Sequence, residues 1–146
     1  MNLPFITNTV ADTNTWLREI AGEIERPGDY QAAYHTLRAV LHTVRDTLVP
    51  EETMNLSAEL TPLLRGILFE GYRLAGKPEP KRSLDIFLQA VDEHLLRYNE
   101  IDIDPEAACR AVFAQLEKHL AAGQSNHVRH MLNHEVQDLW PAATVK

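Results

Sequence analysis

The chain has 146 residues, of which 45% are hydrophobic and 24% charged, a length and composition that fit one folded globular domain and exclude a disordered protein. Its net charge of −7 disfavours general nucleic-acid binding, because proteins of that class carry a basic face. There is no apolar stretch of roughly 20 residues that could span a membrane, no signal-peptide pattern at the start and no second cysteine for an intramolecular disulfide, so we expect a cytoplasmic location.

The N-terminal residues 1–12 are predicted to form an arm with little fixed structure. A first helix is expected to begin at Thr13 or Asn14, which are favoured capping residues, and to end near Glu25, before Pro27 and Gly28. One face of this helix carries the apolar residues Trp16, Leu17, Ile20 and Ile24.

The second predicted helix is the clearest in the chain, with Asp29 as its cap. Its apolar residues recur at alternating spacings of three and four, which is the helical period: they are Tyr34, Leu37, Leu41, Val44 and Leu48. A third helix is expected to follow with Pro50 in its first turn, where proline is tolerated.

The apolar run after Pro50 contains Pro62, which either kinks one helix or begins another. Thr61 could cap a new helix, and Asn133, another capping residue, stands 72 positions later. Two capping residues at matching positions favour a real break, so two short helices are predicted at each place.

A loop is predicted over residues 76–81, which contain one glycine and two prolines. Beyond it, Ser83 is expected to cap a helix, Asp104 and Pro105 to begin a second long helix, and Gly123 to end that helix. Two short helices should follow, the last of them ending before Pro141, and no segment shows the alternation of a strand.

The chain also contains a candidate internal repeat. Arg38-Ala39-Val40 returns 72 residues later as Arg110-Ala111-Val112, and most apolar positions coincide at the same offset, although only five of the 36 paired residues between Tyr34 and Phe69 are identical. Two unrelated amphipathic helices could share such a pattern, but one offset that holds across several predicted breaks favours duplication. We therefore predict an all-α fold, with residues 1–146 as a single domain of two tandem repeats of about four helices each, at about 13–75 and 83–141.

Three histidines near the C-terminus have the spacing of a metal site. His127, His130 and His134 would share one face of a continuous helix and could bind zinc there. The break predicted at Asn133 removes that shared face, so solvated or capping histidines are favoured and no metal is expected.

A second cluster, His35, Arg38, His42 and Arg45, lies one residue beyond the apolar stripe of the second helix; we call it the His/Arg seam. Its arginines, together with Arg110 of the other repeat, could hold a carboxylate or phosphate. The favoured alternative is that they cover the core and pair with carboxylates across the repeat interface.

A short basic segment, residues 65–82, could form a local patch, but acidic residues interrupt it and nucleic-acid binding stays disfavoured. The aromatic residues Phe69 and Tyr72 could pack internally or contact a partner. The chain has no phosphate-binding glycine loop, GxSxG motif or CxxC motif, so no cofactor and no catalytic residue are predicted.

Several of these segments resemble the bacterial "domain of unknown function 2267" family over about residues 10–141. The resemblance rests on Trp16-Leu17, residues 33–42, Arg45-Asp46, residues 60–66, Glu70-Gly71-Tyr72, the second Arg-Ala-Val segment and Leu139-Trp140. It implies a small helical cytoplasmic protein and no particular activity.

We expect a non-enzymatic module that binds a protein partner or a second copy of itself. The alternative is a ligand-binding protein or enzyme that uses His35, Arg38 and His42, in which case these side chains should converge in a concave pocket.

Overall fold

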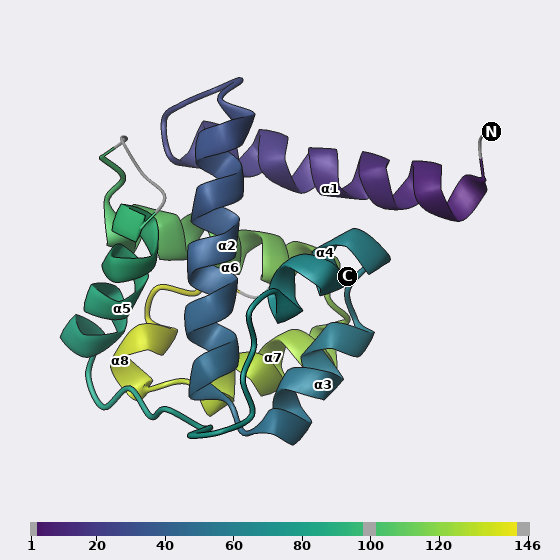
Figure 1. Cartoon of the computed structure of the whole chain (residues 1–146). Coiled ribbons are helices and arrows are strands. Elements are labelled where there is room, and N and C mark those ends of the chain that lie inside the picture. The colour runs from purple at the N-terminus through teal and green to yellow at the C-terminus, as the bar shows by residue number, and fades with distance from the viewer. Residues whose placement is uncertain (1–2, 98–101, 143–146) are drawn as a thin grey trace.

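The computed structural model describes residues 3–97 and 102–142, and within them it contains helices and no strand, which confirms the all-α fold class (Figure 1). Two long helices followed by two short ones occur twice along the chain. The helices are α1 (Pro4–Glu23), α2 (Tyr30–Thr47), α3 (Pro50–Ala58), α4 (Pro62–Phe69), α5 (Leu84–Arg97), α6 (Pro105–His119), α7 (Ala122–Met131) and α8 (His134–Gln137).

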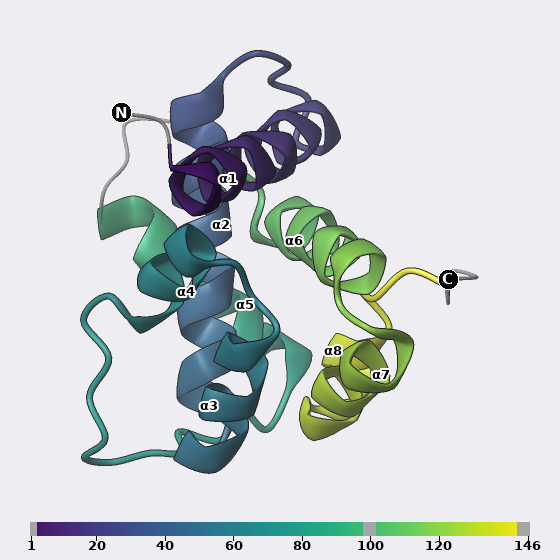
Figure 2. The same ribbon diagram turned by 90° about the vertical axis from the view of Figure 1, so that its right-hand side faces the viewer.

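Helix α2 lies at the centre of the molecule, where it packs against α1, α4, α5 and α6 (Figures 1 and 2). Every residue from Ala39 to Arg45 is buried, so this half of the helix has no solvent-facing side. Three of those residues, His42, Thr43 and Arg45, are polar. A helix surrounded in this way must satisfy its polar side chains internally.

The C-terminal helices complete the same hydrophobic core. Helix α6 packs against α1, α2 and α5, and α7 and α8 follow it on one side of the molecule (Figure 2). Phe87 of α5 and Phe113 of α6 are fully buried, and Trp140, just after α8, stacks on Phe113 with 4.7 Å between ring centroids. Buried residues from all eight helices form one continuous cluster.

Most predicted helix starts are confirmed. The side chain of Asp29 accepts a hydrogen bond from the Ala32 amide at 3.0 Å, and Asp104 and Asn133 make similar caps on α6 and α8. Pro62 stands at the first position of α4, so the break predicted at Thr61 is also confirmed, although the Thr61 side chain makes no capping bond.

The prediction that the N-terminal residues lack fixed structure is wrong for those that the structure describes. Helix α1 already begins at Pro4, a residue well suited to a first turn. Thr13 is therefore an interior residue, and its hydroxyl donates to the Thr9 carbonyl at 2.7 Å instead of capping a helix. The apolar spacing of Leu3, Ile6 and Val10 continues the period of the later turns and was the overlooked signal.

The expected end of the second long helix at Gly123 is also wrong. Helix α6 ends at His119, where Leu120 adopts an extended conformation, and Gly123 lies inside α7. Leu48 ends α2 with the same extended conformation. In both places a buried leucine turns the chain, so a glycine is not required.

The segment between α4 and α5 runs without a helix past the C-terminal end of α2, as predicted for residues 76–81. The amide of Glu79 donates to the Asp46 carbonyl at 2.7 Å, which fastens this segment to α2. It thereby becomes one wall of the pocket described below.

Candidate functional site

His42 of the seam is buried between α2 and α4. Its Nε2 lies 2.8 Å from the carbonyl oxygen of Ile67, and because a carbonyl can only accept, Nε2 must carry the proton. Burial lowers the pKa of His42 to about 3, a shift that the nearby Arg45 and Arg38 reinforce and the bond to Ile67 partly opposes. The imidazole is therefore neutral at physiological pH.

Arg45 lies one turn further along α2 and satisfies the free carbonyls at the end of α4. Its Nη1 donates to the carbonyls of Leu68 and Glu70, each at 2.6 Å, and its Nε donates to Asp46 at 3.1 Å. The guanidinium also lies over the ring of Tyr72, 5.3 Å from its centroid. It thus closes the C-terminal end of a helix whose last carbonyls have no partner within the helix.

The remaining seam residues behave differently from one another. Arg38 forms an ion pair with Glu70, which belongs to the same half of the chain and not to the other repeat. His35 is half-buried, and burial followed by the charge of Arg38 lowers its pKa. Arg110, the counterpart of Arg38 in the second half of the chain, is mainly exposed, and Glu106 of its own helix lies 3.8 Å away. It therefore does not repeat the ion pair between Arg38 and Glu70. His42, Arg45 and Arg38 therefore hold the end of α4, while ligand binding by the seam stays a prediction.

The C-terminal histidines do not form a common face. His127 and His130 lie on α7, whereas His134 begins α8 after the break at Leu132 and Asn133, as the capping pattern predicted. His127 instead lies 2.7 Å from the Glu52 carboxylate of α3. Among the residues that the structure describes, no group of His, Cys, Asp and Glu side chains has the arrangement of a metal site.

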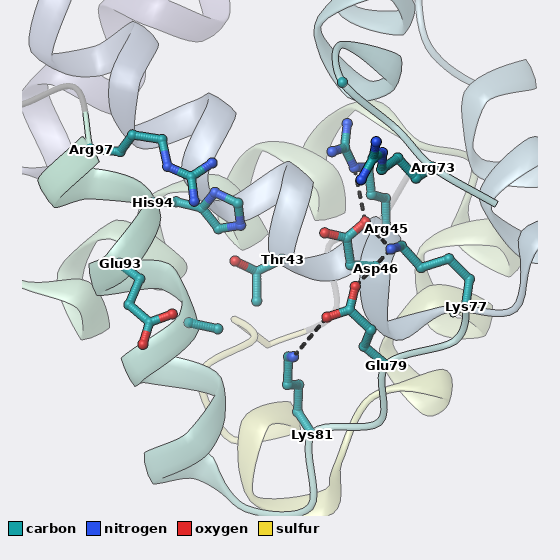
Figure 3. Close-up of a pocket in the computed structure, with 12 residues that line it drawn as sticks. Thr43, Arg45, Asp46, Arg73, Lys77, Glu79, Lys81, Glu93, His94 and Arg97 are labelled. Carbon is teal, nitrogen blue, oxygen red and sulfur yellow. Dashed lines mark hydrogen bonds and ion pairs between the residues drawn. The ribbon is translucent and has the colours of Figure 1, made fainter. Parts of the chain in front are cut away.

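A pocket of about 320 Å³ opens beside the seam, between α2, the segment after α4, and α5 (Figure 3). We call it the basic pocket. None of His35, Arg38, His42 and Arg110 lines it, whereas Arg45 does. Its positively charged lining residues are Arg45, Arg73, Lys77, Lys81 and Arg97, and its acidic ones are Asp46, Glu79 and Glu93.

One side of the basic pocket is a chain of ion pairs. Lys77 donates to Glu79 at 2.7 Å and lies 3.8 Å from Asp46, while Lys81 lies 3.8 Å from the other oxygen of Glu79. This hydrogen bond lowers the pKa of the Glu79 carboxyl group and raises the pKa of the Lys77 ammonium group. These acidic groups are thus largely neutralised by their neighbours.

Two arginines of the basic pocket remain available to bind a ligand. Arg73 and Arg97 are both exposed, and neither forms an ion pair within the described part of the chain. Figure 3 shows Arg97 and His94 of α5 on one side of the pocket and Arg73 on the other, with Thr43 of α2 between them. Burial, with a contribution from Arg97, lowers the pKa of His94, so this ring is neutral. The arrangement can accept an anion.

Sequence reasoning found only part of this pocket. Arg73, Lys77 and Lys81 belong to the basic segment already noted, but the contribution of His94 and Arg97 was missed. Their spacing of three residues on one predicted helix was the available signal. Arg65 of the same basic segment lies elsewhere, where it donates to the carbonyls of Ser57 and Leu60 and closes the end of α3.

A third feature is the N-terminal part of α1, which extends past the other helices (Figure 1). Leu3, Phe5, Ile6 and Val10 are all exposed there, Phe5 at 63%. A hydrogen bond of 2.9 Å from the Leu63 amide to the Thr9 hydroxyl joins this part to α4. Within the described residues, no helix is long and apolar enough to cross a membrane, α1 included.

A family model described as "Uncharacterized conserved protein (DUF2267)" matches residues 13–139, which include most of every helix and the whole lining of the basic pocket. No curated protein matches the chain.

Proposed function

The chain belongs to the DUF2267 family of uncharacterised conserved proteins, and within that family we propose that it acts as a non-enzymatic interaction module that pairs with a second copy of itself through α1. The observation that carries this proposal is the exposed apolar stripe on the projecting turns of α1. In proteins most of the stability of a helix comes from packing of its apolar face, and these turns lack that packing. A partner surface would supply that cover.

The stripe has the period of a helix–helix interface. Leu3, Ile6 and Val10 continue at the same three- and four-residue spacing into Thr13 and Leu17, which already pack within the molecule. The same face of one helix is therefore covered in its C-terminal half and uncovered in its N-terminal half.

The charge distribution favours a second copy as the occupant. The whole protein carries a net charge of −7, so two copies repel each other over most of their surfaces. Residues 3–11 contain no charged side chain, and Asp12 is the first. Pairing these segments brings no like charges together, and a symmetric dimer matches each stripe with its own copy.

Sedimentation equilibrium of the full chain tests this proposal. We expect a concentration-dependent dimer. Ile6→Glu should raise the dissociation constant of this dimer by at least about tenfold, because a charge would enter the apolar contact. Asn8→Glu is the matched control, since it adds the same charge on the opposite side of the helix and should leave the dimer intact. A monomer at every concentration, or equal effects of both variants, would contradict the proposal.

We also propose that the two halves arose by duplication and form one domain. Support comes from the matched burial at an offset of 72 residues: Leu41 and Phe113, Leu48 and Leu120, and Leu64 and Val136 are all buried. The contacts are matched as well, because α1 packs on α2, α6 and α4 while α5 packs on α6, α2 and α8. A cytoplasmic location remains a prediction, and so does the absence of nucleic-acid binding, which rests on the acidic composition.

A further inference from the structure

We propose that the basic pocket between α2, residues 71–81 and α5 binds a small phosphate dianion, either inorganic phosphate or the phosphate group of a small monoester. This inference is independent of the pairing of α1, because the α2 residues that line the pocket, Thr43, Arg45 and Asp46, belong to the last turns of that helix. Figure 1 shows α1 meeting α2 near its N-terminal end.

The first argument is the local charge. Five Arg and Lys side chains and three Asp and Glu side chains line the basic pocket, an excess of two positive charges in a protein whose net charge is −7. Concentrating cations in a concave site of an acidic protein raises the local potential for an anion. A phosphate monoester carries about −1.5 to −2 charges at neutral pH, which matches that excess, whereas a carboxylate carries one.

The second argument is which cations are available. Lys77 is occupied by Glu79, and Arg45 is occupied by two carbonyls and Asp46. Arg73 and Arg97 have no such acceptor within the described residues, and they come from different elements on different sides of the pocket (Figure 3). Arginines on different sides of one pocket can approach different oxygens of a bound phosphate.

The third argument is size and polarity. A volume of about 320 Å³ lies at the lower end of the roughly 300–1,000 Å³ of small-molecule sites. The lining is mainly polar, and its few uncharged members include Thr43 and Gly71. Such a pocket has room for a phosphate together with a small attached group, and its polar lining offers little apolar surface to a larger organic one.

Calorimetric titration of the full chain tests the proposal with inorganic phosphate, glycerol phosphate and acetate as separate probes, in a buffer without phosphate. We expect both phosphate compounds to bind and acetate to bind more weakly by at least about tenfold. Arg97→Gln and Arg73→Gln should each weaken phosphate binding by about tenfold or more, since each removes a charge-assisted contact.

Arg18→Gln is the matched control, because it removes the same charge from an exposed position of α1 outside the pocket. It should leave phosphate binding within about twofold of the unchanged protein. The proposal is overturned if no phosphate compound binds, if acetate binds as tightly as phosphate, or if Arg18→Gln weakens binding as much as Arg97→Gln. Arg73 and Arg97 belong to different elements, so one variant still tests the proposal if the other variant fails to fold. Stronger binding of glycerol phosphate would assign the site to monoesters, and equal binding would assign it to the phosphate group alone.

Discussion

Arg45 and Glu117 occupy matching positions of α2 and α6, 72 residues apart, and both are buried charged residues that hold the chain after the fourth helix of their half. Arg45 donates at 2.6 Å to the carbonyls of Leu68 and Glu70, whereas Glu117 accepts a hydrogen bond of 3.0 Å from the indole nitrogen of Trp140. Trp140 itself matches Leu68 at the same offset. The two halves thus use opposite charges for the same structural task.

Arg45→Met should destabilise the fold by about 2–4 kcal/mol. The methionine fills part of the volume but leaves the carbonyls of Leu68 and Glu70 without their donor, and an unsatisfied buried acceptor costs about 1–3 kcal/mol. Urea denaturation measures the loss. Arg110→Met, at an exposed position, should change the free energy of unfolding by no more than about 0.5 kcal/mol. Similar values for the two variants would show that Arg45 has no special structural role.

His42 should make the fold less stable below pH 6.5. Its pKa is about 3 in the folded protein against 6.5 as its ordinary value, so between these values only the unfolded chain takes up the proton. The free energy of unfolding therefore falls with decreasing pH, by about 1.4 kcal/mol per pH unit for one proton. The loss begins near pH 6.5 and ends near pH 3, and above pH 6.5 the contribution is constant.

His42→Gln isolates this contribution, because the glutamine amide can still donate to the Ile67 carbonyl but cannot titrate. Denaturant unfolding at several pH values should show a dependence that is smaller by about one proton in the variant. His35 and His94, whose pKa values are also lowered, keep their part of the dependence in both proteins. If the free energy of unfolding had the same slope against pH in both proteins, His42 would not be the group that titrates, which would contradict the prediction.

Cys109 should be unreactive in the folded protein. It is fully buried, and burial raises the pKa of its thiol to about 12, so very little thiolate exists near neutral pH. A thiol-specific chromogenic reagent should label it rapidly in strong denaturant and only through rare opening of the fold without denaturant. Fast labelling of the native protein would contradict the burial of α6 at this position.

The sequence predicted most of the helices because their signals are local. Capping residues such as Asp29 and Asn133 and first-turn prolines such as Pro62 act within one turn, so their effect does not depend on tertiary contacts. Residues 3–12 were mispredicted because Thr13 and Asn14 were interpreted as capping residues, although the apolar period of Leu3, Ile6 and Val10 continues beyond them.

The candidate site was less predictable, for a different reason. The seam was recognised from its spacing, but the acceptors of His42 and Arg45 are backbone carbonyls 25 and 23 residues away, which no side-chain pattern shows. The basic pocket joins α2, a connecting segment and α5, and their proximity results only from tertiary packing. The sequence therefore shows which residues are cationic, but not which of them lack an internal partner and can bind a ligand.

Hydrogen exchange of the amides in the N-terminal turns of α1 tests the central claim, self-pairing through this helix, most directly. Mass spectrometry of the full chain at low micromolar and near-millimolar protein concentration should show slower exchange at the higher concentration for residues 4–12, because pairing covers their apolar face and holds the helix together. The buried amides of α2 should exchange at the same rate in both samples. Exchange of residues 4–12 that does not depend on concentration would contradict the claim.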